Sequence, residues 1–192
     1  MNSITISNLK ITNFNDIIKI ADSQFGKGYL SVNELNSYLL TSLKFGICAK
    51  LNKKLIGFAL IQIDNKNHIL NLILKEKKTI NEYLVTSNAV GLIKLVAVEE
   101  KYKKQGVGKT LVEKSISSIS NLVDCLLSVC WINKSGSELA PILEKFGMLP
   151  IITIPNYWKY DSIKLKYTCS ICGCPPCSCN AVVYGKKLSI FL

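Results

Sequence analysis

Arginine is absent from the 192-residue sequence, although 24 basic residues against 13 acidic ones give a formal net charge of +11. Every one of these basic residues is therefore a lysine. A basic surface attracts phosphates, nucleic acid and acidic partners, but bidentate recognition of bases and phosphates is mainly the work of arginine. The composition favours a surface that attracts a polyanionic cofactor, and it argues against a dedicated nucleic-acid-binding protein.

Long apolar runs are missing as well. No run approaches the ~20 residues that a membrane-spanning helix needs, and residues 1–14 lack the basic start, apolar stretch and small-residue cleavage site of a secretory signal. At the same time 48% of the residues are hydrophobic and 19% are charged, which is typical of a folded globular chain. We therefore expect a cytoplasmic protein with no membrane partner, built as one domain with a small appendage.

Apolar periodicity predicts a mixed order of helices and strands. Helices are predicted at residues 13–24, 31–43, 108–122 and within 135–147. Strands are predicted at residues 45–51, 54–63, 67–75, 92–98, 125–132, 148–155 and 162–168, while residues 76–90 form a loop or a short helix. This order indicates an α/β (α+β) fold. We assign the domain to residues 1–168 and the appendage to residues 169–192.

The segment KYKKQGVGKTLVEK (residues 101–114) ends like a loop that binds a nucleotide triphosphate. Such a loop needs a glycine five residues before the glycine of GKT, and Lys103 occupies that position, which argues against a triphosphate site. Gly106 and Gly108 still allow successive backbone N–H groups to converge at the start of a helix, where the helix dipole favours an anion. An ordinary turn with a solvated lysine face is the alternative.

The same region carries a family resemblance. LVAVEEKYKKQGVGKTLVE (residues 95–113) resembles the acetyl-CoA-binding segment of the GNAT acyltransferases, with Lys103 in place of the usual Arg or Gln. LEKFGM (residues 143–148) and WIN (residues 131–133) resemble two later motifs of that family. The resemblance covers residues 4–168. It implies a mixed, mostly antiparallel central sheet with flanking helices and a splayed strand pair formed by residues 92–98 and 125–132.

The resemblance also implies a function: transfer of an acetyl group from acetyl-CoA to a primary amine of a small molecule or protein. The pantetheine arm would lie between the splayed strands, and the pyrophosphate would sit on the N–H groups of the loop. The acceptor is not identified by the sequence. Phe25 and Tyr29, between the first two helices, are expected to contact it or to belong to an ordinary turn. The residues expected to bind the cofactor are Val96, Ala97, Val98, Lys103, Lys104, Gln105, Gly106, Val107, Gly108, Lys109, Thr110 and Asn133.

One departure from the family concerns the chemistry. Many members carry a tyrosine that protonates the departing thiolate where this chain has Leu143, and leucine cannot donate a proton. Tyr157 and Tyr160 follow closely and are candidate donors, although buried aromatic residues mostly serve packing. Glu99, at the end of a predicted strand, is a candidate base, or it only begins the next loop. The alternative function is a catalytically weak CoA-binding or regulatory module.

Cysteine is concentrated near the C-terminus. Five of the eight cysteines lie within the eleven residues CSICGCPPCSC (169–179), and such crowding in a cytoplasmic protein points to a metal before disulfides. Cys-x-x-Cys-Gly is a metal knuckle, and we expect a structural zinc held by Cys169, Cys172, Cys177 and Cys179, with Cys174 spare. An iron–sulfur cluster and reactive or disulfide-forming thiols are the alternatives. Residues 181–192 form a predicted terminal strand that pairs with the core or with a second copy in a homodimer.

Overall fold

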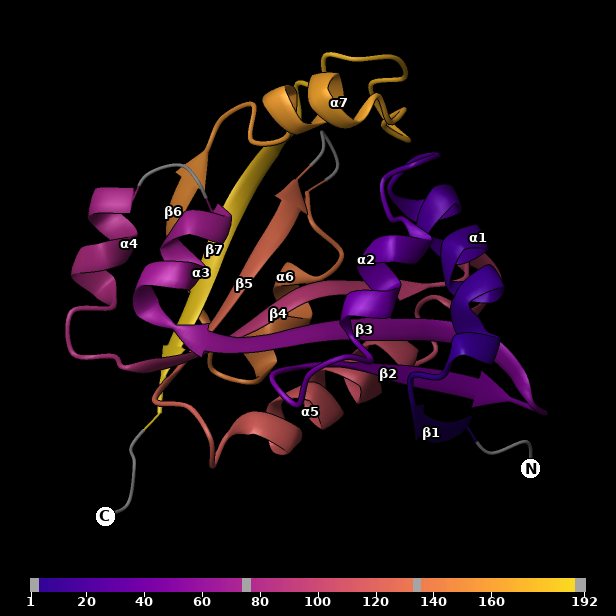
Figure 1. The fold of residues 1–192 in the computed structure, drawn as a ribbon, viewed down its shortest axis with the longest axis horizontal. Coiled ribbons are helices and arrows are strands. Elements are labelled where there is room, and N and C mark those ends of the chain that lie inside the picture. The colour runs from indigo at the N-terminus through magenta and orange to yellow at the C-terminus, as the bar shows by residue number, and fades with distance from the viewer. Residues whose placement is uncertain (1–3, 74–76, 133–135, 189–192) are drawn as a thin grey trace.

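A computed structural model describes residues 4–73, 77–132 and 136–188. Its centre is a seven-stranded sheet in the order β1-β2-β3-β4-β5-β7-β6 (Figure 1). The strands are β1 Ile4–Asn8, β2 Lys44–Leu51, β3 Lys54–Asn65, β4 Ala89–Val98, β5 Cys125–Ile132, β6 Leu149–Ile154 and β7 Asn180–Lys187. The helices are α1 Phe14–Gln24, α2 Val32–Ser37, α3 Lys66–Ile73, α4 Lys77–Tyr83, α5 Val107–Ile119, α6 Ala140–Lys145 and α7 Lys159–Leu165, with short 3-10 turns η1 Ile11–Asn13 and η2 Glu100–Tyr102.

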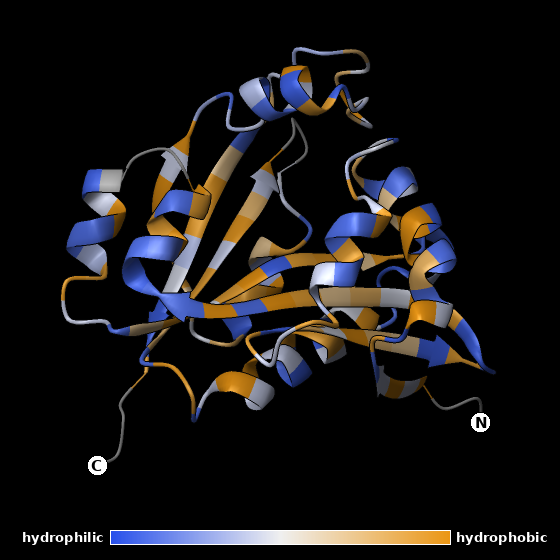
Figure 2. Ribbon diagram, viewed as in Figure 1, coloured by the Kyte–Doolittle hydropathy of each residue, from blue (hydrophilic) through white to orange (hydrophobic). Residues whose placement is uncertain are grey.

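Helices cover both faces of this sheet. α5 packs on β2, β3 and β4 on one face, and α1 packs on β3 and β4 on the other. Hydrophobic residues run along the central strands between these helices (Figure 2). All neighbouring strands are antiparallel except β4 and β5. The predicted mixed α/β fold, with a mostly antiparallel sheet and flanking helices, is therefore confirmed. Among the helices of the described ranges, none combines the length and the apolar character needed to cross a bilayer.

The one parallel pair, β4 and β5, is short. Its last paired residues are Ile93 and Ser128, and beyond them β4 stays on β3 while β5 stays on β7. The Ser128 hydroxyl donates to the Ile93 carbonyl oxygen at 3.0 Å, at the point where the two strands separate. We call the opening between residues 94–98 of β4 and residues 129–132 of β5 the fork. The splayed strand pair that the sequence predicts is thus confirmed.

The predicted strand at residues 67–75 is wrong over its described part, because α3 occupies Lys66–Ile73, and residues 74 and 75 lie outside the described residues. Ile69, Leu70 and Ile73 are its buried residues, and their spacing follows the helical period of 3.6. A short apolar run such as HILNLIL fits a buried strand and a buried helix face about equally well. The tertiary structure decides in favour of the helix, which packs on β3 and β4.

The predicted strand at residues 162–168 is also wrong. α7 occupies Lys159–Leu165 and buries Ser162, while Ile163 and Leu165 stay about half exposed. The alternating pattern of SIKLKYT therefore does not mark a strand. Its first four residues belong to a helix, and the apolar side chains of that helix face outward. The second predicted helix, at residues 31–43, is too long, since α2 ends at Ser37.

The terminal strand β7 lies inside the sheet, between β5 and β6. It pairs with its own chain, which is the first of the two predicted alternatives. Val183 of β7 is fully buried against β5, β6 and the helices α3 and α4. Residues that follow the cysteine-rich segment therefore complete the sheet that the earlier residues begin.

We predict that Val183→Asp unfolds the domain or lowers its free energy of unfolding by about 3–5 kcal/mol, because it leaves an uncompensated charge in the core. Val85→Asp is the matched control, since Val85 is 69% exposed, and it should change stability by less than about 0.5 kcal/mol. Urea unfolding followed by circular dichroism measures both. Equal stability of the two variants would mean that β7 is not an integral strand.

Candidate functional site

The fork opens into a cavity of about 910 Å³, which lies in the size range of pockets for small molecules. One side is formed by β4, with Leu92 and residues 94–98, and the other by Val129 and Trp131 of β5. At one end lies the glycine-containing loop before α5. At the other end lie the α1–α2 connection and the segment between β6 and β7. The cavity therefore runs from the predicted anion site, through the fork, to the cysteine-rich segment.

The loop before α5 has the backbone conformation of an anion cradle. Lys104 and Gly106 both have left-handed backbone angles, with φ of +57° and +85°, and α5 begins directly after Gly106. The first N–H groups of a helix have no partner within it, so those of Val107, Gly108 and Lys109 are available here. A Cβ atom at position 108 would come within 3.2 Å of the Ile142 side chain. Any residue larger than glycine would therefore be crowded at this position.

The structure brings most of the predicted cofactor-binding residues to this cavity. Those that line it are Val96, Ala97, Val98, Lys103, Lys104, Gly106, Gly108 and Lys109. Three others direct their side chains elsewhere: Gln105 donates to the Lys101 carbonyl oxygen, Thr110 donates to the Gly106 carbonyl oxygen, and Val107 is buried in the core. Their backbone groups remain part of the loop. Asn133 lies outside the described residues.

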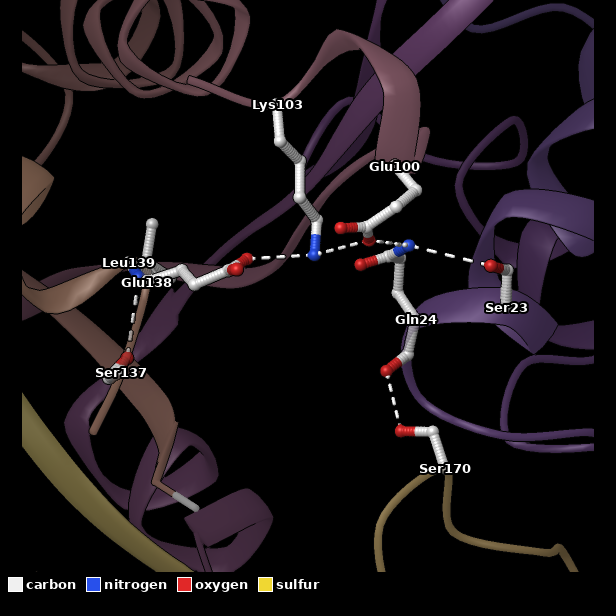
Figure 3. Close-up of polar contacts among 8 residues, drawn as sticks. All are labelled: Ser23, Gln24, Glu100, Lys103, Ser137, Glu138, Leu139 and Ser170. Carbon is white, nitrogen blue, oxygen red and sulfur yellow. Dashed lines mark hydrogen bonds and ion pairs between the residues drawn. The ribbon is translucent and has the colours of Figure 1, made fainter. Parts of the chain in front are cut away.

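A chain of polar contacts crosses the loop end of the cavity (Figure 3). The Lys103 ammonium lies 2.9 Å from Glu100 and 2.9 Å from Glu138, which follows β5. Gln24, at the end of α1, donates to Glu100 at 3.4 Å, and its carbonyl oxygen accepts from the Ser170 hydroxyl at 2.8 Å. Burial disfavours the charged form of Lys103, but the bonds to the two carboxylates outweigh it and raise its pKa. Lys103 therefore joins the loop to both walls.

The predicted catalytic residues lie in three different environments. Glu99 pairs with Lys54 at 2.9 Å and with Lys101 at 3.7 Å, and its neighbour Glu100 is the one that lines the cavity. Tyr160 is 70% exposed on α7. Tyr157 lines the cavity, packs edge-on against Trp158 with ring centroids 4.8 Å apart, and has its pKa raised by burial.

Leu143, at the position of the family's tyrosine, is fully buried between α5, α6 and the sheet. Two α6 side chains line the cavity, those of Ile142 and Lys145. Leu143 and Ile142 carry no proton that they could donate, whereas the Lys145 ammonium does.

Sequence reasoning missed an ion pair inside the cavity. Glu34 of α2 contacts Lys94 of β4, with 2.5 Å between Oε1 and Nζ, and both residues line the cavity. In the sequence, Glu34 only follows the helix cap Ser31 by three residues, and its backbone N–H donates to the Ser31 hydroxyl at 3.1 Å. No local pattern links residues sixty positions apart, so the pair could not be found from the sequence.

The sulfur atoms of Cys169, Cys172, Cys177 and Cys179 lie within 4.8 Å of one another. Closest approaches include 3.4 Å between Cys172 and Cys179, 3.8 Å between Cys169 and Cys179, and 3.9 Å between Cys172 and Cys177. Four thiolates around one Zn²⁺, each at ~2.3 Å, lie about 3.8 Å apart. These four are the cysteines predicted as ligands, while Cys174 is exposed, and the separations fit a tetrahedral metal centre.

Backbone N–H groups point at the sulfurs, as a thiolate site requires. The N–H groups of Ile171 and Cys172 each lie 3.4 Å from Cys169 Sγ, and that of Ser178 lies 3.4 Å from Cys172 Sγ. Burial disfavours the Cys172 thiolate, but hydrogen bonds from the hydroxyl and backbone of Ser178 outweigh it and lower its pKa to about 6. Cys172 is therefore the sulfur on which negative charge is stabilised, whereas burial raises the pKa of Cys177 to about 11 and also raises the pKa of Cys179.

The cysteine segment is hydrogen-bonded to the α1–α2 connection, toward which it reaches in Figure 1. The N–H of Thr168 donates to the Lys27 carbonyl oxygen, and that of Ser170 to the Phe25 carbonyl oxygen, both at 3.1 Å. Gly26 lies between these bonds with φ of +116°, and a Cβ atom there would fall 1.5 Å from the Thr168 carbonyl oxygen. The two segments therefore form one wall of the cavity.

We predict that Gly26→Ala separates these two segments, because the added carbon meets a backbone atom that no side-chain rotation can move. Gly28→Ala is the control: Gly28 also has a positive φ, of +83°, but the nearest atom to its added carbon is 3.7 Å away. The control should cost about 1–2 kcal/mol through backbone strain. Hydrogen exchange at the Thr168 and Ser170 amides should rise in Gly26→Ala and stay near the wild-type rate in Gly28→Ala.

Comparisons with known proteins agree with this architecture. Residues 14–135 match the family described as Acetyltransferase (GNAT) family. Similar solved structures include a chain of the NatC complex bound to Gag peptide and CoA, at 18% identity and a TM-score of 0.68, with 97% of this chain and 99% of that chain covered. NAA60 of Arabidopsis thaliana in complex with a bisubstrate analogue gives 11% identity and a TM-score of 0.70, with 97% and 99% covered.

The ribosomal-protein-S18-alanine N-acetyltransferase of Escherichia coli gives 15% identity and a TM-score of 0.64, with 97% of this chain and 95% of that chain covered. A search of curated protein sequences finds no match. At these identities the solved structures establish the fold, whereas the family match spans well over half of the sequence. With its fork, glycine loop and family match, this chain belongs to the GNAT acetyltransferase family.

Proposed function

We propose that this protein transfers an acetyl group from acetyl-CoA to a primary amine of a small molecule or protein. The observation that carries the proposal is the continuity of the fork with the cradle before α5, within one cavity. A ligand with a phosphate end and a long, narrow amide-containing arm fits such a path. CoA has this shape, and it is bound in the NatC complex to which this chain is similar.

The loop is suited to the pyrophosphate of CoA. Unbonded N–H groups at the start of α5, the positive end of the helix dipole and the side chains of Lys104 and Lys109 converge on one end of the cavity. The pantetheine arm would lie along residues 95–98 of β4, whose edge toward β5 has lost its strand partner. Backbone groups on such an edge need hydrogen-bond partners, and the amides of the arm can supply them.

The amine acceptor would approach from the other end of the cavity. Phe25, Tyr29, Trp158 and Tyr167 form an aromatic surface there, with rings of Tyr29 and Tyr167 meeting edge-on at 5.1 Å. The carboxylates of Glu34 and Asp161 also line the cavity. A cationic amine with an apolar neighbouring group matches this combination of surfaces.

A CoA-binding module with little or no turnover is the second candidate. Leu143 favours it, because this buried side chain cannot protonate a thiolate. The two candidates share CoA binding and differ in whether CoA is released when an amine is added.

Titration with acetyl-CoA tests the shared part of both candidates. We expect binding at micromolar concentrations by calorimetry, and weaker binding in Lys109→Ala because one phosphate-attracting charge is lost. Lys53→Ala, which changes an exposed lysine of the β2–β3 turn, is the control for net charge. Failure of the folded wild-type protein to bind would overturn the function. Acceptor-dependent release of CoA, measured chromatographically, would exclude the inactive module.

We also propose that Cys169, Cys172, Cys177 and Cys179 hold one structural Zn²⁺. The separations between their sulfurs and the N–H groups directed at them support a tetrahedral thiolate centre. Four thiolates would complete the coordination of the ion and leave no position for a reactive water. The metal would hold residues 168–170 against the α1–α2 connection. A reducing compartment, with the cytoplasm as our proposal, keeps such thiols available.

Replacing a ligand should therefore affect the metal and the stability more than the cofactor. We expect Cys172→Ser to lose zinc and to melt at a lower temperature, with acetyl-CoA affinity within about twofold of wild type, because the groups proposed to bind CoA belong to β4, the loop before α5 and α5. Cys174→Ser is the matched control and should keep both zinc and stability. Elemental analysis of protein purified without chelator measures the metal. Less than about a tenth of an equivalent of zinc, with freely titratable thiols, would contradict the saturated site.

A further inference from the structure

We propose that Glu34 and Lys94 are the catalytic pair of the proposed acetyl transfer. Glu34 accepts a proton from the acceptor amine, and the Lys94 ammonium stabilises the negative charge that develops on the thioester during transfer. This inference rests on the proposed function and supplies the chemistry that Leu143 cannot perform. The main observation behind it is that the Glu34–Lys94 pair lies beside the closed end of the fork, where the β4–β5 pairing ends.

Lys94 lies where β4 departs from regular pairing. Leu60 of β3 pairs with Leu95, and Ile61 pairs with Ile93, so Lys94 is the extra residue of a β-bulge. Two consecutive side chains consequently share one face: Leu95 packs in the cluster that contains α1 residues, and Lys94 reaches Glu34 of α2. A bulge of this kind redirects a side chain and is frequent beside active sites.

The fork determines where the acetyl group would stop. A pantetheine arm that enters from the loop after Val98 cannot pass Ile93 and Ser128, because the strands are paired there and the Ser128 hydroxyl caps the Ile93 carbonyl oxygen. From Val98 to Lys94 the strand extends about 13 Å, at ~3.3 Å per residue. The reactive end of the arm would therefore lie beside Lys94, at the closed end.

Glu34 is the carboxylate closest to that end. Of the carboxylates that line the cavity among the described residues, Glu100 and Glu138 are paired with Lys103 at the loop. Asp161 lies on α7, beyond the end of β5 (Figure 1). Glu34 is held by the start of α2, through its N–H bond to Ser31, and by Lys94. Its side chain is 30% exposed, so an incoming amine can reach it.

The proton and electron count of the transfer is consistent with these roles. The protonated amine gives one proton to Glu34, and its freed electron pair forms the C–N bond at the thioester carbon. The carbonyl oxygen then carries a negative charge that the Lys94 ammonium attracts. When the C–S bond breaks, the electron pair leaves with sulfur as a thiolate. The nitrogen loses its second proton, so that one proton ends on the sulfur of CoA and one passes to solvent.

An ammonium group can replace a tyrosine in this role without transferring a proton. Coulomb attraction to a thiolate or an oxyanion is strong in a cavity that excludes water, and it requires only that the cation be placed before the reaction starts. The bond to Glu34 supplies that placement.

Steady-state kinetics test the pair. Three acceptors are used: a tetrapeptide with a free α-amine, N-α-acetyl-lysine and spermidine. For the best acceptor we expect kcat to fall about 100-fold or more in Glu34→Gln, in line with the loss of a general base, and to fall similarly in Lys94→Met. KM for acetyl-CoA and the melting temperature should stay near wild type. Formate should restore part of the activity of Glu34→Ala by replacing the missing carboxylate, an effect that a purely structural role would not produce.

Surface variants Lys54→Met and Glu113→Gln should leave kcat unchanged, whereas Glu99→Gln and Tyr157→Phe test the competing assignments. A kcat within twofold of wild type in Glu34→Gln, or a large loss in Glu99→Gln instead, would overturn the pair while leaving acetyl transfer intact. Absence of turnover in the wild-type protein with all three amines would count against acetyl transfer itself, and therefore against the pair as well.

A second experiment needs no acceptor. In Lys94→Cys a thiol would stand beside the acetyl position, so bromoacetyl-CoA should alkylate it: a C–S bond forms, the C–Br bond breaks and bromide leaves. Peptide mapping should locate the label at residue 94, and excess CoA should prevent it. Lys54→Cys should not show CoA-protected labelling at residue 54. Normal acetyl-CoA binding without protected labelling at residue 94 would show that the arm does not end beside Lys94, and would overturn the inference without affecting the cofactor site.

Discussion

The ending of the β4–β5 pairing at Ile93 and Ser128 is the constraint on which the rest of this structure depends. Two parallel strands in mid-sheet can separate only if each remains paired along its other edge. β3 holds β4 and β7 holds β5 beyond the fork, and the Ser128 hydroxyl satisfies the Ile93 carbonyl oxygen at the point of separation. The result is a gap lined by backbone groups without strand partners, in the interior of an otherwise regular sheet.

β7 therefore links the C-terminal part of the chain to the proposed cofactor path. Between β6 and β7 the chain leaves the sheet, forms α7 and the four-cysteine cluster, and contacts the α1–α2 connection through Thr168 and Ser170. It then returns to fill the position beside β5. The same segment that supports one side of the fork thus forms the far wall of the cavity, which ties the proposed metal centre to the acceptor end.

Charges are distributed unevenly along the cavity. Lysines surround the anion cradle before α5, and Lys103 is balanced there by Glu100 and Glu138. The Glu34–Lys94 pair stands at the closed end of the fork, and aromatic rings line the cavity on the side of the cysteine-rich segment. A single cavity thus offers a cationic end for phosphates, an ion pair at the closed end of the fork and an aromatic surface for an amine.

The sequence by itself determined the features that depend on neighbouring residues: the glycine loop and α5, the buried strands from β2 to β5, and the cysteines that gather into a cluster. Only the tertiary structure decided that residues 66–73 and 159–165 are helices. Short apolar runs fit both the helical period and the strand period, and the residues packed against them decide which structure forms. It alone inserted β7 between β5 and β6, turned Leu143 into the core and Ile142 toward the cavity, and joined Glu34 to Lys94. Contacts between residues far apart in the chain are set by the complete sheet and its bulge, and no local pattern encodes them.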